Sequence, residues 1–567
     1  MKTSFWNPQN IVLVLLPVLT LTFLLGESKY VEPLFIHSTY YLLLALVVTW
    51  AVILLNSARG LTKAAVLDWV KDNKAGIAIA LAVTVVAALA VHPALRVLAD
   101  ETNLLGTSKN FFASKTATFT TTGKYYYDNF WDAGVVIDRR PSLFPFLVSI
   151  VHALRGYSYT NVFLFNLLVL PFFVLISYRL AKSLGGEVFG VASALLVAAH
   201  PITLISVRSG GFDFLAAFFS VVIIKSFLDH CRAPSATRLA VLWMNVCMFA
   251  ELRYETGLFV APVVFFLLVF RLAKLEYLRP YRIIYALTPA FFLPRIWQAI
   301  LRGNVPEQDA GAITFSVGNF ITNTVDYFKI IIHPFDGRSP HAAFVIALGV
   351  IGCILAIRWM VKRLIPRDRP IPEMQFSAML AGWMLLQIVI VFTYVWGRPD
   401  HPASARLIIS IDTFFAFPAA WALTVVLGRI RPVLATVICV GLFTMYVPVA
   451  AQCRILNELT LTREADTTWR FFESLHEKRI LIITERPGLF TVMNYGSLDF
   501  EAAKQDPSAL EGLARHLYYD IYLVQSVDLT TNKPFPQFDI WPDRDRMTML
   551  EFQNDANATV RISRLAH

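Results

Sequence analysis

The chain has 567 residues, of which 56% are hydrophobic and only 16% are charged. A soluble chain of this length carries about 25% charged residues, so the composition excludes an ordinary water-soluble protein and predicts one whose main solvent is lipid. The net charge of +10 does not indicate nucleic-acid binding. The Lys and Arg residues cluster beside apolar segments, where the positive-inside rule places them.

Long apolar segments recur along the chain up to residue 450. Crossing the hydrocarbon core of a membrane takes about 20 apolar residues in a helix, and the windows of that kind predict about 13 transmembrane helices. The predicted spans are 10–26, 38–56, 76–98, 160–181, 187–206, 213–229, 238–252, 257–272, 283–300, 342–360, 374–396, 406–427 and 432–450. The first is interpreted as a retained helix, because the residues after it lack the small-x-small pattern of a cleaved signal peptide.

Basic residues are concentrated in the loops after the second, fourth, sixth, eighth, tenth and twelfth predicted spans. All six loops fall on one side of the membrane when the N-terminus lies in the cytoplasm. We therefore expect a multi-pass protein of a bacterial inner (plasma) membrane, with a cytoplasmic N-terminus and an extracytoplasmic C-terminal domain. The loops 100–159, 301–341 and 397–405 then lie on the outer side.

The chain divides into three predicted parts: an N-terminal transmembrane hairpin (1–75), a main transmembrane module (76–450) and a tail (451–567). Charge rises in the tail, where helical stretches at 468–477 and 508–516 alternate with strand-like stretches at 479–484 and 519–525. This alternation predicts a small α/β domain. The fold class expected is therefore an α-helical polytopic membrane protein with a small C-terminal α/β extracytoplasmic domain.

The outer loop 100–159 is rich in aromatic residues, which is typical of a membrane interface. These are Phe111, Phe112, Tyr125, Tyr126, Tyr127, Phe130 and Trp131. The stretch 142–154 is apolar but too short to span, so it predicts a helix that lies in the interface or re-enters the membrane.

Carboxylates at the outer ends of predicted spans are the first candidates for chemistry. Asp100 and Glu101 follow the third span, and Asp213 opens the sixth. Partial desolvation at a membrane surface raises the proton affinity of a carboxylate, which suits a general base. Each candidate also has a plain structural interpretation. The pair can be a solvated helix end, and Asp213 can be an N-terminal carboxylate that the helix dipole favours.

Basic groups on the outer side run against the positive-inside trend and indicate an anionic partner. Arg139 and Arg140 precede the short apolar stretch, and arginine forks suit phosphate oxygens. The plain alternative is an anchor for anionic head groups. The further candidates for a substrate site are Arg208, Arg253, Glu255, His333, His401 and Arg406. Neither the histidines nor the five cysteines have the spacing of metal ligands, so no metal ligand set is predicted.

Four motifs follow one another in a fixed order. They are Asp100-Glu101, Arg140-Pro141-Ser142-Leu143-Phe144-Pro145, Ser209-Gly210-Gly211-Phe212-Asp213 and Leu252-Arg253-Tyr254-Glu255-Thr256-Gly257. This ordered set resembles the GT-C glycosyltransferases, most closely the protein O-mannosyltransferases, aminoarabinose transferases and related bacterial enzymes. The resemblance covers roughly residues 76–450. In most relatives the acidic pair follows the first helix, so its place after the third implies that residues 1–75 are an additional hairpin.

The resemblance implies a GT-C-like fold and an inverting transfer of a sugar from a polyprenyl-phosphate donor to an extracytoplasmic acceptor. It implies Asp100 as the catalytic base, Glu101 as its support or an acceptor ligand, and Asp213 as a second acidic residue near the sugar. Arg139, Arg140 and Arg406 are the implied ligands of the lipid phosphate. The implied partners are membrane lipids and a protein, lipid or glycan acceptor, with no nucleic acid. A divalent metal is left open as a cofactor, because metal dependence differs among the branches.

Two other functions compete with this interpretation. A lipid-linked glycan flippase or transporter would place ionisable residues near the middle of the membrane and often shows two related halves, and the sequence indicates neither. An O-antigen ligase or polymerase-type enzyme also uses outer arginines, but the early acidic pair is less expected there.

Overall fold

The computed structural model describes residues 28–126, 129–138, 140–302, 314–333, 339–364, 372–401, 403–427, 432–452, 460–541, 544–553 and 558–565. The predicted span 10–26 lies outside these residues. The chain forms two compact units. The first comprises Met1–Pro93, Arg139–Phe144 and Phe163–Arg454, and the second comprises Ala94–Asp138, Pro145–Val162 and Ile455–His567.

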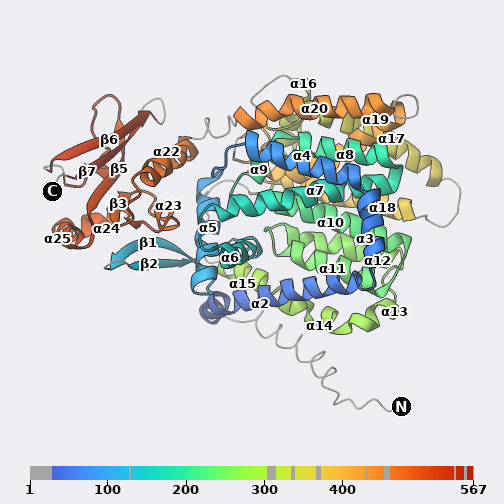
Figure 1. Ribbon diagram of the computed structural model, residues 1–567, viewed down its shortest axis with the longest axis horizontal. Coiled ribbons are helices and arrows are strands. Elements are labelled where there is room, and N and C mark those ends of the chain that lie inside the picture. Colours follow the sequence, from blue (N-terminus) through green and yellow to red (C-terminus); the bar gives the residue numbers. More distant parts are fainter. Residues whose placement is uncertain are drawn as a thin grey trace, which may run out of the picture. The chain divides into compact units, whose positions relative to one another are not determined.

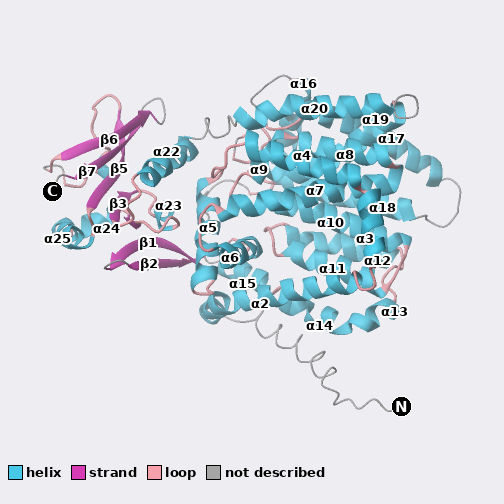
Figure 2. Ribbon diagram, in the orientation of Figure 1, coloured by secondary structure: helices cyan, strands magenta, loops and turns pink. Residues whose placement is uncertain are grey.

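The first unit is built of helices, and the strands of the described chain lie in the second (Figures 1 and 2). Its α-helices are α2 (Ser28–Ser57), α3 (Lys63–Asp72), α4 (Lys74–Ala90), α7 (Asn161–Gly185), α8 (Glu187–Ala199), α9 (Pro201–Val207), α10 (Asp213–Arg232), α11 (Ala236–Ala250), α12 (Val260–Val269), α13 (Leu275–Leu278), α14 (Arg282–Phe291), α15 (Leu293–Arg302), α16 (Val317–Ile332), α17 (Ala343–Leu364), α18 (Pro372–Thr393), α19 (Ile409–Val426) and α20 (Pro432–Gln452). Three short 3-10 helices are η1 (Thr256–Phe259), η2 (Arg279–Tyr281) and η3 (Ala405–Ile408). Helix α7 begins in the second unit with its first two residues.

Seven of the described helices are long and apolar enough to cross a membrane, or nine if two bent pairs each count as one span. The bent pairs are α3–α4, at 69°, and α8–α9, at 70°. Shorter apolar helices occupy the predicted spans 238–252, 257–272 and 342–360. The chain is thus an α-helical polytopic membrane protein, as predicted, while the total of about 13 spans stays a prediction.

Proline explains two of the helix ends. Pro201 is the first residue of α9, and because proline lacks an N–H and disfavours helical geometry in the residue before it, α8 ends at Ala199. Pro93 acts in the same way beyond α4, which ends at Ala90. The predicted span 76–98 was therefore too long, and the acidic pair 100–101 begins a separate helix.

Helix α19 is packed closely against its neighbours in the first unit. It contacts both α8 and α17 (Figure 1). A Cβ added to Gly352 in α17 would lie 2.0 Å from the carbonyl oxygen of Pro418 in α19. Small residues allow such a close backbone approach between membrane helices. The position of α19 matters because it continues from η3.

Helix α16 lies between residues 301 and 341, which were predicted to form a loop, and it was not predicted from the sequence. The Ser316 hydroxyl caps it by accepting a hydrogen bond from the backbone N–H of Asn319 at 3.0 Å. The side-chain amide of Asn323 donates to the carbonyls of Phe392, at 2.9 Å, and Tyr394, at 3.0 Å. These bonds attach α16 to the end of α18.

The second unit combines residues from the loop predicted at 100–159 with residues from the tail. Its elements are α5 (Leu98–Ala113), β1 (Thr118–Tyr126), β2 (Asn129–Ile137), α6 (Leu143–Arg155), α22 (Thr460–Ser474), β3 (Ile480–Thr484), α23 (Gly488–Thr491), β4 (Gly496–Leu498), α24 (Phe500–Gln505), α25 (Pro507–Leu517), β5 (Asp520–Asp528), η4 (Pro536–Phe538), β6 (Arg546–Gln553) and β7 (Ala558–Leu565). The strands form one seven-stranded sheet in the order β2-β1-β4-β3-β5-β7-β6. Strand β3 runs parallel to β4 and β5, and the other pairs are antiparallel.

The predicted C-terminal sheet domain is confirmed. The stretches 479–484 and 519–525 correspond to β3 and β5, and the helical stretches correspond to α22 and α25. The sequence did not predict that the hairpin β1–β2, from the loop predicted at 100–159, joins this sheet, with Gly123 opposite Ser497. The short helix predicted at 142–154 is present as α6, whose first two residues belong to the first unit.

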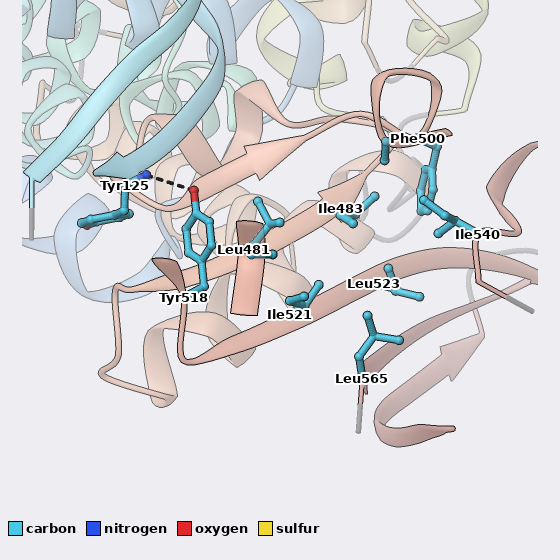
Figure 3. Packing of buried hydrophobic residues seen from close by; sticks show 11 residues of the cluster. Tyr125, Leu481, Ile483, Phe500, Tyr518, Ile521, Leu523, Ile540 and Leu565 are labelled. Carbon is cyan, nitrogen blue, oxygen red and sulfur yellow. Dashed lines mark hydrogen bonds between the residues drawn. The ribbon is translucent and has the colours of Figure 1, made fainter. Parts of the chain in front are cut away.

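Some loop aromatics predicted at a membrane interface are packed inside the second unit instead. Tyr125 is buried with Leu481, Ile483 and Tyr518 in the core of the sheet (Figure 3). The backbone N–H of Tyr125 donates to the Tyr518 hydroxyl at 3.0 Å. The Tyr125 hydroxyl donates to the carbonyl of Asn494 at 2.8 Å. The loop and the tail therefore share one hydrophobic core.

The substitution Tyr518→Phe tests this shared core. It leaves the buried N–H of Tyr125 without its acceptor, and an unsatisfied buried donor costs about 1–3 kcal/mol. We expect the free energy of unfolding of the full-length protein in detergent to fall by that amount. Tyr519→Phe is the control, because Tyr519 is 56% exposed and its ring is kept. Equal effects of the two substitutions would contradict the shared core.

Helices α5 and α6 are joined by a buried polar chain. Ser108 Oγ lies 3.1 Å from His152 Nε2, and His152 Nδ1 lies 2.9 Å from Asn161 Nδ2. The Asn161 amide also donates to the carbonyl of Gly156 at 2.9 Å, which fixes its orientation. His152 Nδ1 is thus an acceptor and Nε2 carries the proton, while Ser108 Oγ donates to the carbonyl of Leu105 at 2.7 Å. His152 donates to Ser108, so it does not activate this serine as a nucleophile. These hydrogen bonds instead hold α5 and α6 together.

Burial lowers the pKa of His152 from 6.5 to about 4. Between these two pH values the unfolded chain binds a proton that the folded chain does not, so stability rises with pH through this window and is lost as pH falls below 6.5. We expect a loss of about 3 kcal/mol at most by pH 4. His152→Gln, which keeps an N–H for Ser108, should flatten this dependence in unfolding measured from pH 4 to 7. The exposed His516→Gln should leave the dependence unchanged.

Candidate active site

Asp213 is the first residue of α10 and is buried, with 4% of its side chain exposed. The loop before it is fixed by Asn166 of α7, whose side-chain amide donates to the carbonyls of Ser209 and Gly211, both at 3.0 Å. The N-terminal end of a helix favours a negative charge. The local fold therefore holds the Asp213 carboxylate rigidly at the end of a helix.

Arg253 reaches Asp213 from the turn after α11. The Thr256 hydroxyl stabilises this turn, accepting from the backbone N–H of Arg253 at 3.0 Å and donating to its carbonyl at 2.8 Å. Arg253 Nη1 donates to Asp213 Oδ1 at 2.6 Å. Arg253 Nε lies 2.8 Å from Glu255 Oε1, and the guanidinium carbon lies 5.5 Å from the centre of the Phe212 ring. Arg253 thus bridges two carboxylates.

Arg406 completes this group, which we name the Asp213 cluster (Asp213, Arg253, Glu255 and Arg406). It lies in η3, and its Nη1 donates to Asp213 Oδ2 at 3.3 Å. Each carboxylate oxygen of Asp213 therefore faces one arginine. Arg253 is 9% exposed, whereas Arg406 and Glu255 are 16% and 17% exposed. The buried pair Asp213 and Arg253 and the partly buried Glu255 and Arg406 thus compensate one another's charges, which buried charges require.

The acidic pair lies in the second unit, in the first turn of α5. Glu101 is 1% exposed, and its Oε2 accepts a hydrogen bond from the backbone N–H of Arg96 at 3.0 Å. Asp100 is half-buried. Glu101 thus holds the chain that leads into α5, while its neighbour is the more accessible carboxylate.

The structure places the other predicted site residues on other elements. Arg140 is half-buried just before α6, and Arg139 lies outside the described residues. Arg208 Nε donates to the carbonyl of Val91, at the end of α4, at 3.0 Å. His333 is exposed at the end of α16.

His401 lies in the loop before η3 and is half-buried. Its carbonyl accepts hydrogen bonds from the backbone N–H groups of Ser404 and Ala405, both at 3.0 Å. This turn feeds directly into the segment that carries Arg406. Among the predicted site residues that the structure describes, those of the Asp213 cluster form one contact network.

The sequence did not predict a second group of buried polar residues, around Asp412. Asp412 in α19 is fully buried and lies 2.5 Å from His341 Nδ1 through its Oδ2. The Tyr327 hydroxyl donates to Asp412 Oδ1 at 2.7 Å, and His200 Nδ1 lies 3.4 Å from Oδ2. An ionisable residue inside an apolar span is a functional suspect, and this signal was available at Asp412 in the span 406–427.

Among the residues that the structure describes, no three His, Cys, Asp or Glu side chains are grouped so that they could hold a metal ion. Neither the Asp213 cluster nor the group around Asp412 offers such a ligand set within those residues. The divalent metal stays open, as the resemblance left it.

No family model and no curated protein matches this sequence. The solved structures do offer matches. ArnT from Cupriavidus metallidurans bound to undecaprenyl phosphate matches with a TM-score of 0.50 and 13% identity, over 86% of this chain and 97% of that chain. The fold is GT-C-like.

Two further solved structures match less closely. ArnT from the same organism in the apo state has a TM-score of 0.49 and 13% identity, over 88% of this chain and 98% of that chain. The Archaeoglobus fulgidus oligosaccharyltransferase, tethered with an acceptor peptide containing the NVT sequon, has a TM-score of 0.44 and 12% identity. This match covers 81% of this chain and 70% of that chain. At such low identity, the match to ligand-bound ArnT establishes the GT-C-like fold alone.

Proposed function

We propose that this chain is an integral membrane glycosyltransferase that moves a sugar from a polyprenyl-phosphate donor to an extracytoplasmic acceptor. The GT-C-like fold supports the class of enzyme, and the undecaprenyl phosphate bound to ArnT supports the class of donor. The observation that carries the proposal is the Asp213 cluster. There two arginines converge on one carboxylate at helix ends, where the head group of a membrane lipid can approach.

The two arginines have different parts in the proposed reaction. Arg253 is the more buried and bridges Asp213 and Glu255, so it fixes the geometry. Arg406 is the more exposed of the two. A guanidinium has five N–H donors, so Arg406 can bond Asp213 and a phosphate together. Asp213 then orients the arginines instead of acting as a base. Arg139 and Arg140 are proposed as further ligands of the lipid phosphate.

Asp100 is the proposed general base. The acceptor gives its proton to the Asp100 carboxylate, and its oxygen or nitrogen attacks the anomeric carbon from the face opposite the phosphate. The bond between that carbon and the phosphate oxygen breaks, and the electron pair leaves with polyprenyl phosphate. The arginines stabilise the negative charge that develops there. The half-buried setting of Asp100 and the buried hydrogen bond of Glu101 support this division of roles.

Transfer by the purified protein tests the proposal. The full-length protein in liposomes is incubated with a panel of radiolabelled polyprenyl-phosphate sugars and candidate acceptors, and both free polyprenyl phosphate and labelled product are measured. We expect at least one donor to be cleaved by wild type and much more slowly by Arg406→Gln. Labelled lipid that crosses the bilayer uncleaved would favour a flippase, and no cleavage across the panel would reject the transferase.

A further inference from the structure

The second buried group, which we name the Asp412 network (Asp412, His341, Tyr327 and His200), joins parts of the first unit that are far apart in the sequence. Its members come from α19, the loop before α17, α16 and the joint between α8 and α9. All four side chains are buried, and Asp412, His341 and His200 are at most 1% exposed. Burying so many polar groups is unfavourable unless they pair, and here His341, Tyr327 and His200 all contact the Asp412 carboxylate.

His341 makes contacts through both of its ring nitrogens. Nδ1 lies 2.5 Å from the Asp412 carboxylate, and Nε2 lies 3.3 Å from the carbonyl oxygen of Pro399. His341 therefore links Asp412 in α19 to Pro399, in the loop that precedes η3.

Both of these contacts act on the segment that carries Arg406. Arg406 and Asp412 lie on one continuous helical segment, Ala405–Val426. Asp412 fixes this segment from within α19, while Pro399 fixes the loop that enters it. Neighbouring Pro340 accepts a hydrogen bond from the backbone N–H of Ile202 at 2.7 Å, which ties the same region to the start of α9.

We propose that His341 is a positioning residue that holds Arg406 against Asp213 through its bonds to Asp412 and Pro399. The Asp213–Arg406 contact, at 3.3 Å, is the longer of the two arginine contacts of Asp213. Its geometry depends on where η3 lies. Arg253 is held separately by the Thr256 turn. The network therefore supports Arg406 directly, whereas Arg253 has a support of its own.

A cycle of substitutions tests the geometric claim without reference to catalysis. The unfolding midpoint of the full-length protein in detergent is measured for Arg406→Gln alone, for His341→Leu alone and for the pair. If His341 holds Arg406 in place, Arg406→Gln lowers the midpoint less than half as much in the His341→Leu background as in wild type. The control Arg253→Gln lowers it in the His341→Leu background at least as much as in wild type, because Arg253 then remains as the partner of Asp213. Equal effects of Arg406→Gln in both backgrounds would overturn the proposal.

Milder variants keep the test decisive if His341→Leu does not fold. Tyr327→Phe removes one hydrogen bond to Asp412 and should also reduce the effect of Arg406→Gln, without reducing that of Arg253→Gln. His341→Asn keeps an N–H near the position of Nδ1, so Arg406→Gln should keep most of its wild-type effect in this background. An undiminished effect of Arg406→Gln in the Tyr327→Phe background would contradict the positioning role.

The catalytic consequence rests on the proposed function. In the transfer assay we expect His341→Leu to lower kcat/KM for the donor about tenfold or more, as misplacing a binding group does, and His341→Asn to recover part of the loss. A wild type without transfer would reject the proposed function, while the cycle of unfolding midpoints would still decide the positioning claim. Coupling in that cycle together with unchanged kcat/KM in His341→Leu would reject the role of Arg406 in donor binding.

Discussion

Asp100→Asn is expected to lower the rate of sugar transfer by about 10²–10⁴-fold, the usual contribution of a general base. The amide keeps the size of the side chain but cannot take the proton of the acceptor. Donor binding should change little, because the lipid phosphate is proposed to bind arginines. The measurement is kcat and KM for a cleaved donor with the full-length protein in liposomes.

Glu101→Gln is the matched control for Asp100→Asn. Its remaining side-chain oxygen can still accept from the backbone N–H of Arg96, so the start of α5 should keep its structure and much of the activity should remain. Full activity of Asp100→Asn together with loss of activity in Glu101→Gln would exchange the two roles. Full activity of both variants would remove the acidic pair from the mechanism.

Asp213→Asn is expected to lower the free energy of unfolding by about 3–5 kcal/mol, because removing one partner of a buried ion pair leaves an uncompensated charge. Here the buried Arg253 and the partly buried Arg406 lose their shared partner. The measurement is unfolding of the full-length protein in mixed micelles with increasing denaturing detergent.

Asp400→Asn is the control for this effect. Asp400 pairs with Arg398 at 3.0 Å, but the two side chains are 49% and 51% exposed. An exposed pair contributes about 0–1 kcal/mol, so this substitution should change stability little. If Asp213→Asn changed stability no more than Asp400→Asn, the Asp213 cluster would not be a compensated buried group.

The sequence predicted the features that depend on local composition. Apolar runs located the helices, because crossing lipid demands them, and the alternation in the tail located β3 and β5. The motifs also named Asp213 and Arg253 as separate candidates. Their pairing was not predicted, because the charges of Arg253 and Glu255 can be satisfied by many partners.

Long-range pairing explains what the sequence did not predict. Strand β1 pairs with β4 through Gly123 and Ser497. Neither segment alone indicates which strand it pairs with. The Asp412 network likewise brings His200, Tyr327 and His341 to a residue in a distant helix. The end of α4 was misplaced for a local reason, since a window of apolar residues does not register the effect of Pro93 on the helix.

Binding of the donor lipid tests the central claim, that the Asp213 cluster takes a lipid phosphate, most directly. The affinity of the full-length protein in detergent is measured for undecaprenyl phosphate and for undecaprenol, in wild type and in Arg406→Gln. A hydrogen bond to a charged group contributes about 1.5–3 kcal/mol, which is about 10–100-fold in affinity. We predict that Arg406→Gln weakens the binding of undecaprenyl phosphate by this factor and leaves that of undecaprenol unchanged. Equal affinity of wild type and Arg406→Gln for undecaprenyl phosphate would contradict the claim.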